Sequence, residues 1–252
     1  MSDLLIQWPA AKYWDKPWNP ILGCHPCSPA CDNCYAKASA KRFGMSFEPH
    51  PQNGKCPRKG VIFCGNMTDL FGEWVRVQGQ FDWFSTLWHF PHRHGGPVPN
   101  DATYLFLTKR VGNMVKAVDN YTYMPHCYFG FTAENQEWFD NRIGDFRTVS
   151  PRKVNGWLSA EPLLGPIDLG LRYIAPEDQP FEWVVVGCES GPHRRPCKTE
   201  WVEAIVEQCQ STNIPVFVKQ LDINGKCERD ITKFPEHLRI RQVPWETKKE
   251  GV

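Results

Sequence analysis

The sequence lacks any run of about 18 apolar residues, the length that an apolar helix needs to cross a membrane. Residues 1–8 lack the basic and long apolar regions of a secretory signal peptide. We therefore expect no membrane partner and a cytoplasmic location. Thiols are kept reduced in the cytoplasm, so the 11 cysteines are expected to be free thiols or metal ligands rather than a disulfide framework.

The sequence also has almost no net charge. Its 29 Lys and Arg residues balance 28 Asp and Glu residues, so the overall electrostatic field neither favours nor excludes a nucleic acid partner. No recognised nucleic-acid-binding motif and no low-complexity tract occurs. Hydrophobic residues make up 41% of the 252 residues. We expect one globular domain over residues 1–252, because α/β barrels of about 200–250 residues commonly form one domain.

Four cysteines are crowded into residues 24–34, a loop stiffened by proline. Cys27, Cys31 and Cys34 follow the spacing Cys-x3-Cys-x2-Cys. Iron–sulfur clusters normally take four thiolates, so three ligands leave one iron open, like the free coordination position of a catalytic metal. The spacing therefore predicts a reactive [4Fe-4S] cluster on these three cysteines.

Cys24 allows other interpretations of the cysteine loop. Including it gives Cys-x2-Cys-x3-Cys-x2-Cys, which could close a structural zinc site, and the chain would then be a zinc-stabilised binding or adaptor module without catalysis. Zinc ribbons usually separate their cysteine pairs by about 15–20 residues, and the separation here is much shorter. A ferredoxin-type run has a different spacing, and a redox disulfide is the remaining alternative.

A short apolar run that ends in a polar or charged residue recurs along the chain. Each run is continuous rather than alternating, which is typical of parallel strands covered by helices and joined by right-handed crossovers. We therefore expect an α/β fold with parallel strands in a partial or full (β/α) barrel. The expected strands are 18–23, 61–64, 104–107, 128–131, 157–160, 183–188 and 214–218.

Charged residues follow six of these runs. Functional groups of a (β/α) barrel lie at the C-terminal ends of its strands, so these side chains are expected to converge on one mouth. A single glutamate there could instead be a helix N-terminal residue favoured by the helix dipole, but the repetition favours a site. The six residues are Asp69, Lys109, Glu134, Glu161, Glu189 and Lys219.

Other segments have simpler interpretations. Residues 36–42 predict a helix because they are rich in helix formers, and residues 47–59 predict a loop because they are rich in Pro and Gly. Residues 81–90 predict a buried helix, since apolar residues occur all around it. Residues 222–252 predict a C-terminal wrap or lid around the barrel.

The three-cysteine spacing is the signature of radical S-adenosylmethionine (AdoMet, or SAM) enzymes, and most of the chain resembles a phage-associated three-cysteine-motif family of that superfamily. The resemblance implies a partial (β/α) barrel of the radical SAM type with the cluster on the three cysteines. The blocks that carry the resemblance are 18–36, 66–71, 107–110, 134–136, 158–166, 187–191 and 217–220.

The resemblance also implies the chemistry. AdoMet would bind the open iron, and an electron from an external flavodoxin-like or ferredoxin-like donor would cleave it to a 5′-deoxyadenosyl radical that abstracts a substrate hydrogen. The phage context suggests modification of a DNA base or nucleotide, such as thymine hypermodification, in the host cytoplasm if a phage encodes the chain. The residues implied to bind the cofactor are Tyr35, Asn66, Asp69, Lys109, Glu134, Asn135, Glu161, Glu189 and Lys219.

Two positions depart from the pattern of the superfamily. Many members carry an aromatic residue just before the last cluster cysteine, whereas here Asn33 stands there and Tyr35 follows. Many show Gly-Gly-Glu after the second strand, whereas here Asn66 follows Gly65. Phosphates of a nucleic acid could be contacted by a set of basic residues that could equally form solvated loops, namely Arg58, Lys59, His193, Arg194 and Arg195.

Overall fold

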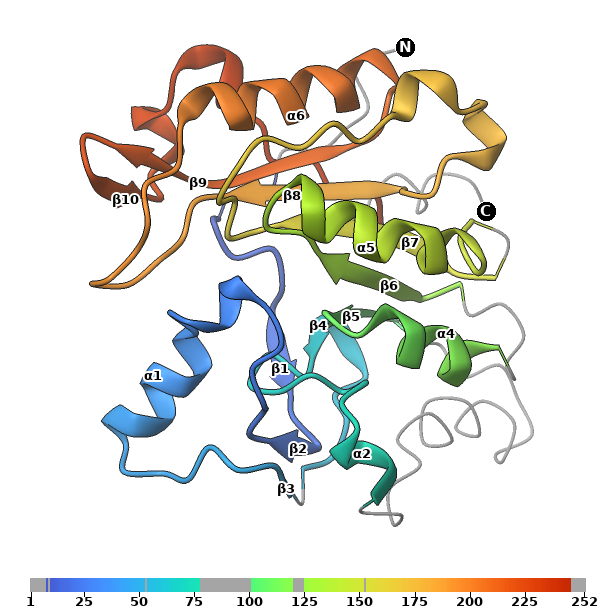
Figure 1. The fold of residues 1–252 in the computed structure, drawn as a ribbon, viewed down its shortest axis with the longest axis vertical. Coiled ribbons are helices and arrows are strands. Elements are labelled where there is room, and N and C mark those ends of the chain that lie inside the picture. Colours follow the sequence, from blue (N-terminus) through green and yellow to red (C-terminus); the bar gives the residue numbers. More distant parts are fainter. Residues whose placement is uncertain are drawn as a thin grey trace.

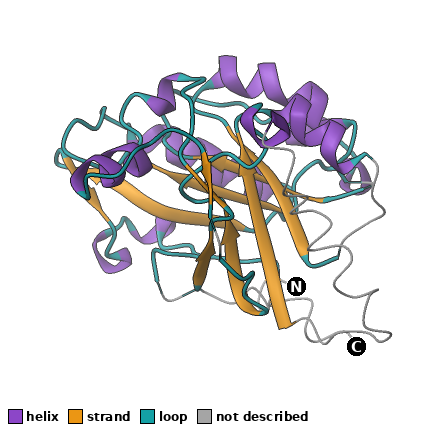
Figure 2. Cartoon of the chain, turned by 90° about the horizontal axis from the view of Figure 1, so that it is seen from below, coloured by secondary structure: helices purple, strands orange, loops and turns teal. Residues whose placement is uncertain are grey.

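The computed structural model describes residues 8, 10–52, 54–77, 101–119, 125–151 and 153–245. Their main feature is a curled sheet of eight strands (Figures 1 and 2), in the order β1-β4-β5-β6-β7-β8-β9-β10. Neighbouring strands are parallel from β1 to β9, and β10 is antiparallel to β9. The strands are β1 (Lys16–Trp18), β4 (Lys59–Cys64), β5 (Asp101–Thr108), β6 (Cys127–Thr132), β7 (Asn155–Ala160), β8 (Trp183–Gly187), β9 (Val216–Ile223) and β10 (Lys226–Glu228).

The predicted α/β class with a parallel sheet is confirmed. The sheet is a half-barrel, because β1 and β10 form its two edges and do not pair with each other. Of the two predicted forms, partial and full, the structure has the partial one. The later apolar runs predicted as strands all fall within or overlap β4 to β9.

The central strands are buried on both faces, which explains their continuous apolar sequence. In β8, Val184 and Val186 belong to the core between the sheet and the helices, while Trp183 and Val185 belong to a second core on the opposite face. Three helices cover the first face, namely α4 (Val111–Val118), α5 (Gln136–Arg147) and α6 (Thr199–Ser211).

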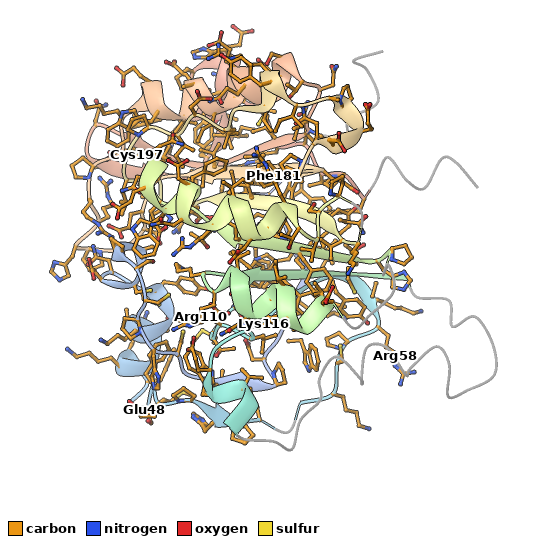
Figure 3. All side chains as sticks on the ribbon, turned by 45° about the vertical axis from the view of Figure 1, so that its right-hand side comes forward. Glu48, Arg58, Arg110, Lys116, Phe181 and Cys197 are labelled. Atoms are coloured by element: carbon orange, nitrogen blue, oxygen red, sulfur yellow. The ribbon has the colours of Figure 1, made fainter. Side chains whose placement is uncertain are left out.

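Aromatic rings dominate both cores. The ring of Phe181, which Figure 3 labels, stacks on Phe146 of α5 with centroids 5.8 Å apart. On the opposite face, Trp183 meets the rings of Tyr13 at 5.1 Å and Trp245 at 4.9 Å. Both ends of the described chain thus help to fill one face of the sheet. After β10 the chain returns to this face, where Arg241 bridges to β9.

The remaining helical elements are short. The cysteine loop contains η1 (Pro29–Cys31) and leads into α1 (Tyr35–Arg42), and α2 (Trp74–Val77) lies after β4. None of the helices in the described ranges is long and apolar enough to span a bilayer. The other 3-10 turns are η2 (Leu171–Tyr173), η3 (Pro176–Asp178), η4 (Ile231–Lys233) and η5 (Glu236–Leu238).

Three local predictions were wrong in detail. The single strand expected over residues 18–23 is two short strands, β1 and β2 (Ile21–Leu22), because Pro20 has no N–H to donate to a ladder. β2 pairs antiparallel with β3 (His50–Pro51), which lies inside the predicted loop. β7 is followed by η2 and η3 rather than by an α-helix. The helix predicted over residues 81–90 lies outside the described residues.

Candidate functional site

The cysteine loop is anchored at both of its ends. Gly23 has a φ of +89°, and a Cβ at this position would lie 2.5 Å from the backbone oxygen of Glu48, so only glycine fits there. The next residue, Cys24, donates its N–H to the Phe47 carbonyl at 3.1 Å. At the other end, Cys34 is the N-cap residue of α1. The loop is therefore fixed between β2 and α1.

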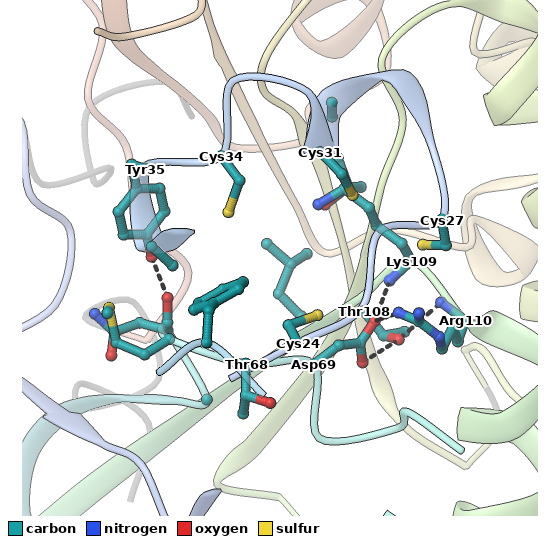
Figure 4. A pocket seen from close by; sticks show the side chains of 18 of the residues that line it. Cys24, Cys27, Cys31, Cys34, Tyr35, Thr68, Asp69, Thr108, Lys109 and Arg110 are labelled. Atoms are coloured by element: carbon teal, nitrogen blue, oxygen red, sulfur yellow. Dashed lines mark hydrogen bonds and ion pairs between the residues drawn. The ribbon is translucent and has the colours of Figure 1, made fainter. Parts of the chain in front are cut away.

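All four cysteines of the loop line one cavity of about 130 Å³ (Figure 4). The opposite wall comes from the ends of β4 and β5, including Asn66, Asp69, Lys109 and Arg110. The tertiary structure thus brings the predicted cluster ligands and several predicted strand-end residues to one place. Within the described ranges, no three His, Cys, Asp or Glu side chains are grouped closely enough to hold one metal ion as the chain stands.

The thiols of the loop differ in acidity. A hydrogen bond from the Cys27 thiol is the main influence on Cys31 and, helped by the Lys109 ammonium, it lowers the pKa of Cys31 from 9.0 to about 4 against the effect of burial. The same hydrogen bond, reinforced by burial, raises the pKa of Cys27. Burial, together with the negative charge of Asp69, raises the pKa of Cys24 to about 11. Cys31 is therefore a thiolate at neutral pH.

Lys109 provides positive charge beside these thiols. It lines the cysteine cavity and also the larger cavity next to it. Burial lowers its pKa, but the negative charges of Cys31, Glu134 and Asp69 outweigh burial and raise the pKa. The ammonium is accordingly charged at neutral pH and lies in the wall that the two cavities share.

Asp69 joins the end of β4 to the end of β5. Its carboxylate accepts hydrogen bonds from the Thr108 hydroxyl at 2.8 Å and the Lys109 N–H at 3.0 Å, and it pairs with Arg110 at 3.2 Å. Arg110 also donates to the His25 carbonyl of the cysteine loop at 2.9 Å. Asp69 therefore positions Arg110, which in turn holds the loop against the sheet.

Two further predicted carboxylates also brace the cysteine loop. Glu134 is fully buried, where it pairs with Arg142 at 2.7 Å and accepts a hydrogen bond from Ser28 of the loop. Glu189 accepts a hydrogen bond from Asn33 of the loop at 2.9 Å and pairs with Arg195 at 2.5 Å. Both carboxylates are thus already bonded to the chain's own donors.

A larger cavity of about 470 Å³ adjoins the cysteine cavity at the C-terminal ends of the strands. The residues that line both cavities include Cys34, Tyr35, Asn66 and Lys109. Through Cys34, the cysteine cavity therefore meets a chamber large enough for a small molecule. Other residues that line this chamber are Tyr13, Trp14, Phe63, Ser159, Glu161, Cys188, Glu189, Lys219 and Arg229.

Within the larger cavity, Glu161 and Lys219 form an ion pair at 2.6 Å. The Lys219 ammonium also lies 5.5 Å from the centre of the Tyr13 ring. Tyr35 donates its hydroxyl to the Asn66 carbonyl, and the Asn66 side chain accepts a hydrogen bond from Asn19 at 2.7 Å. This chamber offers charged groups of both signs beside aromatic surfaces.

A family model described as "Protein of unknown function (DUF5131)" matches residues 9–239. The chain belongs to the DUF5131 family. No curated protein and no solved structure matches it. The matched range includes the cysteine loop and every residue of the chain that lines the two cavities, so the site lies within the part shared with this family.

Of the nine predicted cofactor residues of the DUF5131 protein, seven line the two cavities and two do not. Glu134 lies behind the loop, and Asn135 is the N-cap of α5, where its side chain accepts the Trp138 N–H at 3.1 Å. Residues missed from the sequence include Arg110, which directly follows Lys109, and Tyr13. No spacing rule connects Tyr13, far upstream, to the strand ends.

Basic residues proposed from the sequence as phosphate contacts are partly engaged elsewhere. Arg194 pairs with Asp222 at 2.8 Å, and Arg195 pairs with both Glu189 and Asp32. These guanidinium groups therefore tie the loop after β8 to the sheet and to the cysteine loop.

Proposed function

We propose that this DUF5131 protein is a radical SAM enzyme that holds a [4Fe-4S] cluster on Cys27, Cys31 and Cys34. The observation that carries the proposal is the placement of these three thiols in the wall of one cavity, which adjoins a larger cavity lined by aromatic and charged side chains at the C-terminal strand ends. Catalytic groups of (β/α) barrels lie at this end of the strands.

The residues of the cysteine cavity fit such a cluster chemically. Thiolates are the ligands of iron–sulfur clusters, and Cys31 is a thiolate at neutral pH. A cluster with three thiolates is anionic, and the Lys109 ammonium lies on the same cavity wall. Nearby charge and hydrogen bonds set the reduction potential of a cluster, so Lys109 would favour the reduced form. Binding of the cluster would draw the three thiols closer together than they lie in the protein without it.

When bound, the cluster and AdoMet together supply one-electron chemistry that removes a hydrogen atom from a substrate. The protein supplies binding and orientation. The methionine part of AdoMet carries an ammonium and a carboxylate, and both need partners of opposite charge or hydrogen-bonding groups. Asn66, Lys109 and the Glu161–Lys219 pair offer these groups on the walls of the joined cavities.

Aromatic residues of the larger cavity support a substrate with a planar ring. Tyr13, Trp14, Tyr35 and Phe63 all line it, and bases stack on aromatic side chains without regard to sequence. We therefore favour a nucleic acid base or a nucleotide as the substrate. Arg194 and Arg195 are engaged in ion pairs, which makes these two residues weak candidates for phosphate contacts.

The test is anaerobic purification followed by iron and sulfide analysis. We expect brown protein with about four irons per chain, and release of 5′-deoxyadenosine when the protein is reduced in the presence of AdoMet. Cys31→Ala should lose both properties. Cys56→Ser is the matched control, because Cys56 lies outside the loop and should retain both. Colourless protein without acid-labile sulfide would refute the proposal.

A zinc-stabilised binding module is the second candidate, favoured by one observation. Cys24 lines the same cavity as the other three thiols, and four thiolates complete a structural zinc site. One zinc per chain, no sulfide and loss of the metal in Cys24→Ala would select this function. Full iron content in Cys24→Ala would exclude it.

A further inference from the structure

The exposed face of α1 and the turn after it form a basic and apolar surface, which we call the α1 patch. It consists of Lys37, Lys41, Arg42, Phe43 and Met45, all exposed. Phe43 is 71% exposed and Met45 is 45% exposed. Exposed large apolar side chains gathered beside charges mark interaction sites more often than isolated ones do.

The charge of the α1 patch is not neutralised by the described part of the chain. No Asp or Glu occurs from residue 33 to residue 47. In the described ranges, Lys37, Lys41 and Arg42 form no ion pair, whereas Arg110, Arg194 and other basic residues around the cavities do. The patch therefore presents three positive charges that no described carboxylate pairs with, and the Arg42 guanidinium lies 5.8 Å from the centre of the Phe43 ring.

The α1 patch lies next to the cysteine cavity. α1 begins directly after Cys34 and has eight residues, so the whole helix extends only about 12 Å from that thiol. Ala36 and Ala40 face the interior, and their small side chains allow the helix to lie close against the protein. Figure 1 shows α1 apart from α4, α5 and α6, so these helices leave its outer face uncovered.

We propose that the α1 patch is the docking site for an acidic one-electron carrier protein. The inference rests on the proposed function, because a cluster at Cys27, Cys31 and Cys34 needs an electron from outside the chain. In the docked complex the reduced carrier loses one electron and the cluster gains it. The short path from α1 to Cys34 is suited to electron transfer through protein.

The composition of the α1 patch favours a protein partner over a nucleic acid. Phe, Met and Arg are enriched in protein interfaces, whereas charged residues other than Arg are placed at the rim. Phe43 and Met45 would form the desolvated centre, with Lys37 and Lys41 at the rim. Opposite charges on the two partners accelerate association, and redox complexes have small interfaces, consistent with a single helix face.

The test compares K37E/K41E and F43S with the matched double variant K116E/R147E, which reverses two exposed charges on α4 and α5 (Lys116 is shown in Figure 3). The probe is reduced flavodoxin, mixed by stopped flow with each cluster-loaded protein at low salt. We expect K37E/K41E to lower the second-order rate of cluster reduction about tenfold or more, and F43S to lower it severalfold. The control should match the unmodified chain.

Dithionite, a small reductant that needs no docking site, separates this proposal from the proposed function. We expect it to reduce the cluster at the same rate in every variant, and we expect high salt to remove most of the difference between K37E/K41E and the unmodified chain. If the cluster loads and dithionite reduces it but flavodoxin reduces all variants equally fast, the docking proposal is overturned and the proposed function stands. Weaker binding of a DNA oligonucleotide by K37E/K41E, with electron transfer unchanged, would overturn it in favour of a nucleic acid surface.

Discussion

Asn33 donates a hydrogen bond of 2.9 Å to the carboxylate of Glu189, which lies 156 positions later in the sequence. This contact joins the cysteine loop to the end of β8. Arg195 completes it by pairing with the same carboxylate and donating to the Pro29 carbonyl at 2.9 Å. The loop is thereby held over the mouth of the half-barrel rather than free in solvent.

Glu189→Gln should destabilise this junction. At pH 7 we expect a loss of about 1–3 kcal/mol in the free energy of unfolding, the usual cost of losing hydrogen bonds to a charged group. Burial raises the pKa of Glu189, but hydrogen bonds from Arg195 and Asn33 outweigh it and hold the pKa below 4.5. The stabilisation is therefore present above pH 4.5 and is lost as the pH falls through the folded pKa.

Urea unfolding at several pH values measures this effect. The difference in the free energy of unfolding between Glu189→Gln and the unmodified chain should become smaller as the pH is lowered. Glu48→Gln is the control, since Glu48 is exposed and, among the described residues, its carboxylate pairs with the exposed His25 alone, so its loss should cost well under about 1 kcal/mol. Equal stability of the two variants at pH 7 would contradict the prediction.

Cys31 should be the most reactive thiol of the loop in the metal-free protein at pH 6. Its pKa is lowered to about 4, so it is a thiolate there, and thiolates are the species that alkylating reagents attack. Iodoacetamide labelling followed by peptide mass spectrometry gives the order of modification. Cys27→Ala should slow the labelling of Cys31, because it removes the hydrogen bond that lowers the pKa of Cys31, whereas Cys209→Ala should not. Preferential labelling of Cys24 would be inconsistent with this account.

Asp69→Asn should unfold at lower denaturant concentration. It removes a buried carboxylate that pairs with Arg110, and breaking a buried ion pair costs about 3–5 kcal/mol. Thr108→Val is the comparison, because it removes the hydrogen bonds that the Thr108 hydroxyl makes with Asp69 and with the Arg110 N–H but keeps the ion pair, and it should cost about 1–3 kcal/mol. Equal midpoints for the two variants would show that the pairing with Arg110 contributes nothing.

Gly23→Ala should disturb the cysteine loop more than Gly44→Ala. Both glycines have positive φ, but a Cβ on Gly23 would meet the backbone of Glu48 at 2.5 Å, while nothing lies within 4 Å of one on Gly44. We expect Gly44→Ala to cost about 1–2 kcal/mol from its φ alone. Gly23→Ala should cost more and also reduce the iron bound after reconstitution. Unchanged iron content in Gly23→Ala would disprove the anchoring role of Gly23.

Much of the sheet could be predicted from the sequence because the central strands are buried on both faces and are therefore continuously apolar. The predicted runs in β4 and β6 are examples. The split of residues 18–23 into β1 and β2 was missed, since it depends on which partner strand each half meets. The 3-10 turns η2 and η3 after β7 were also missed. The connection from β7 to β8 can cover the sheet without an α-helix, and the apolar pattern of β7 does not indicate which kind of connection follows.

The candidate site could be predicted only in part. The strand-end positions of Glu161 and Lys219 follow from the apolar runs before them. The sequence did not show that these two residues form an ion pair with each other. The ion-pair partner of Glu134 was likewise not predicted. Glu134 is one of the six charged residues that follow the apolar runs, and its position suggested a contact with a ligand. Its pairing with Arg142 arises on the first turns of α5 and makes it a buried brace.

The sequence by itself determined the crowding of the thiols, the parallel α/β class and the residues that end each strand, because these depend on spacing and on local hydrophobic pattern. Only the tertiary structure decided which charged side chains form ion pairs with one another. Asp69, Glu134 and Glu189 brace the loop with arginine partners, whereas Glu161 and Lys219 face the larger cavity. The reason is physical: pairing of side chains across a curled sheet depends on strand order and curvature, which no short stretch of sequence encodes.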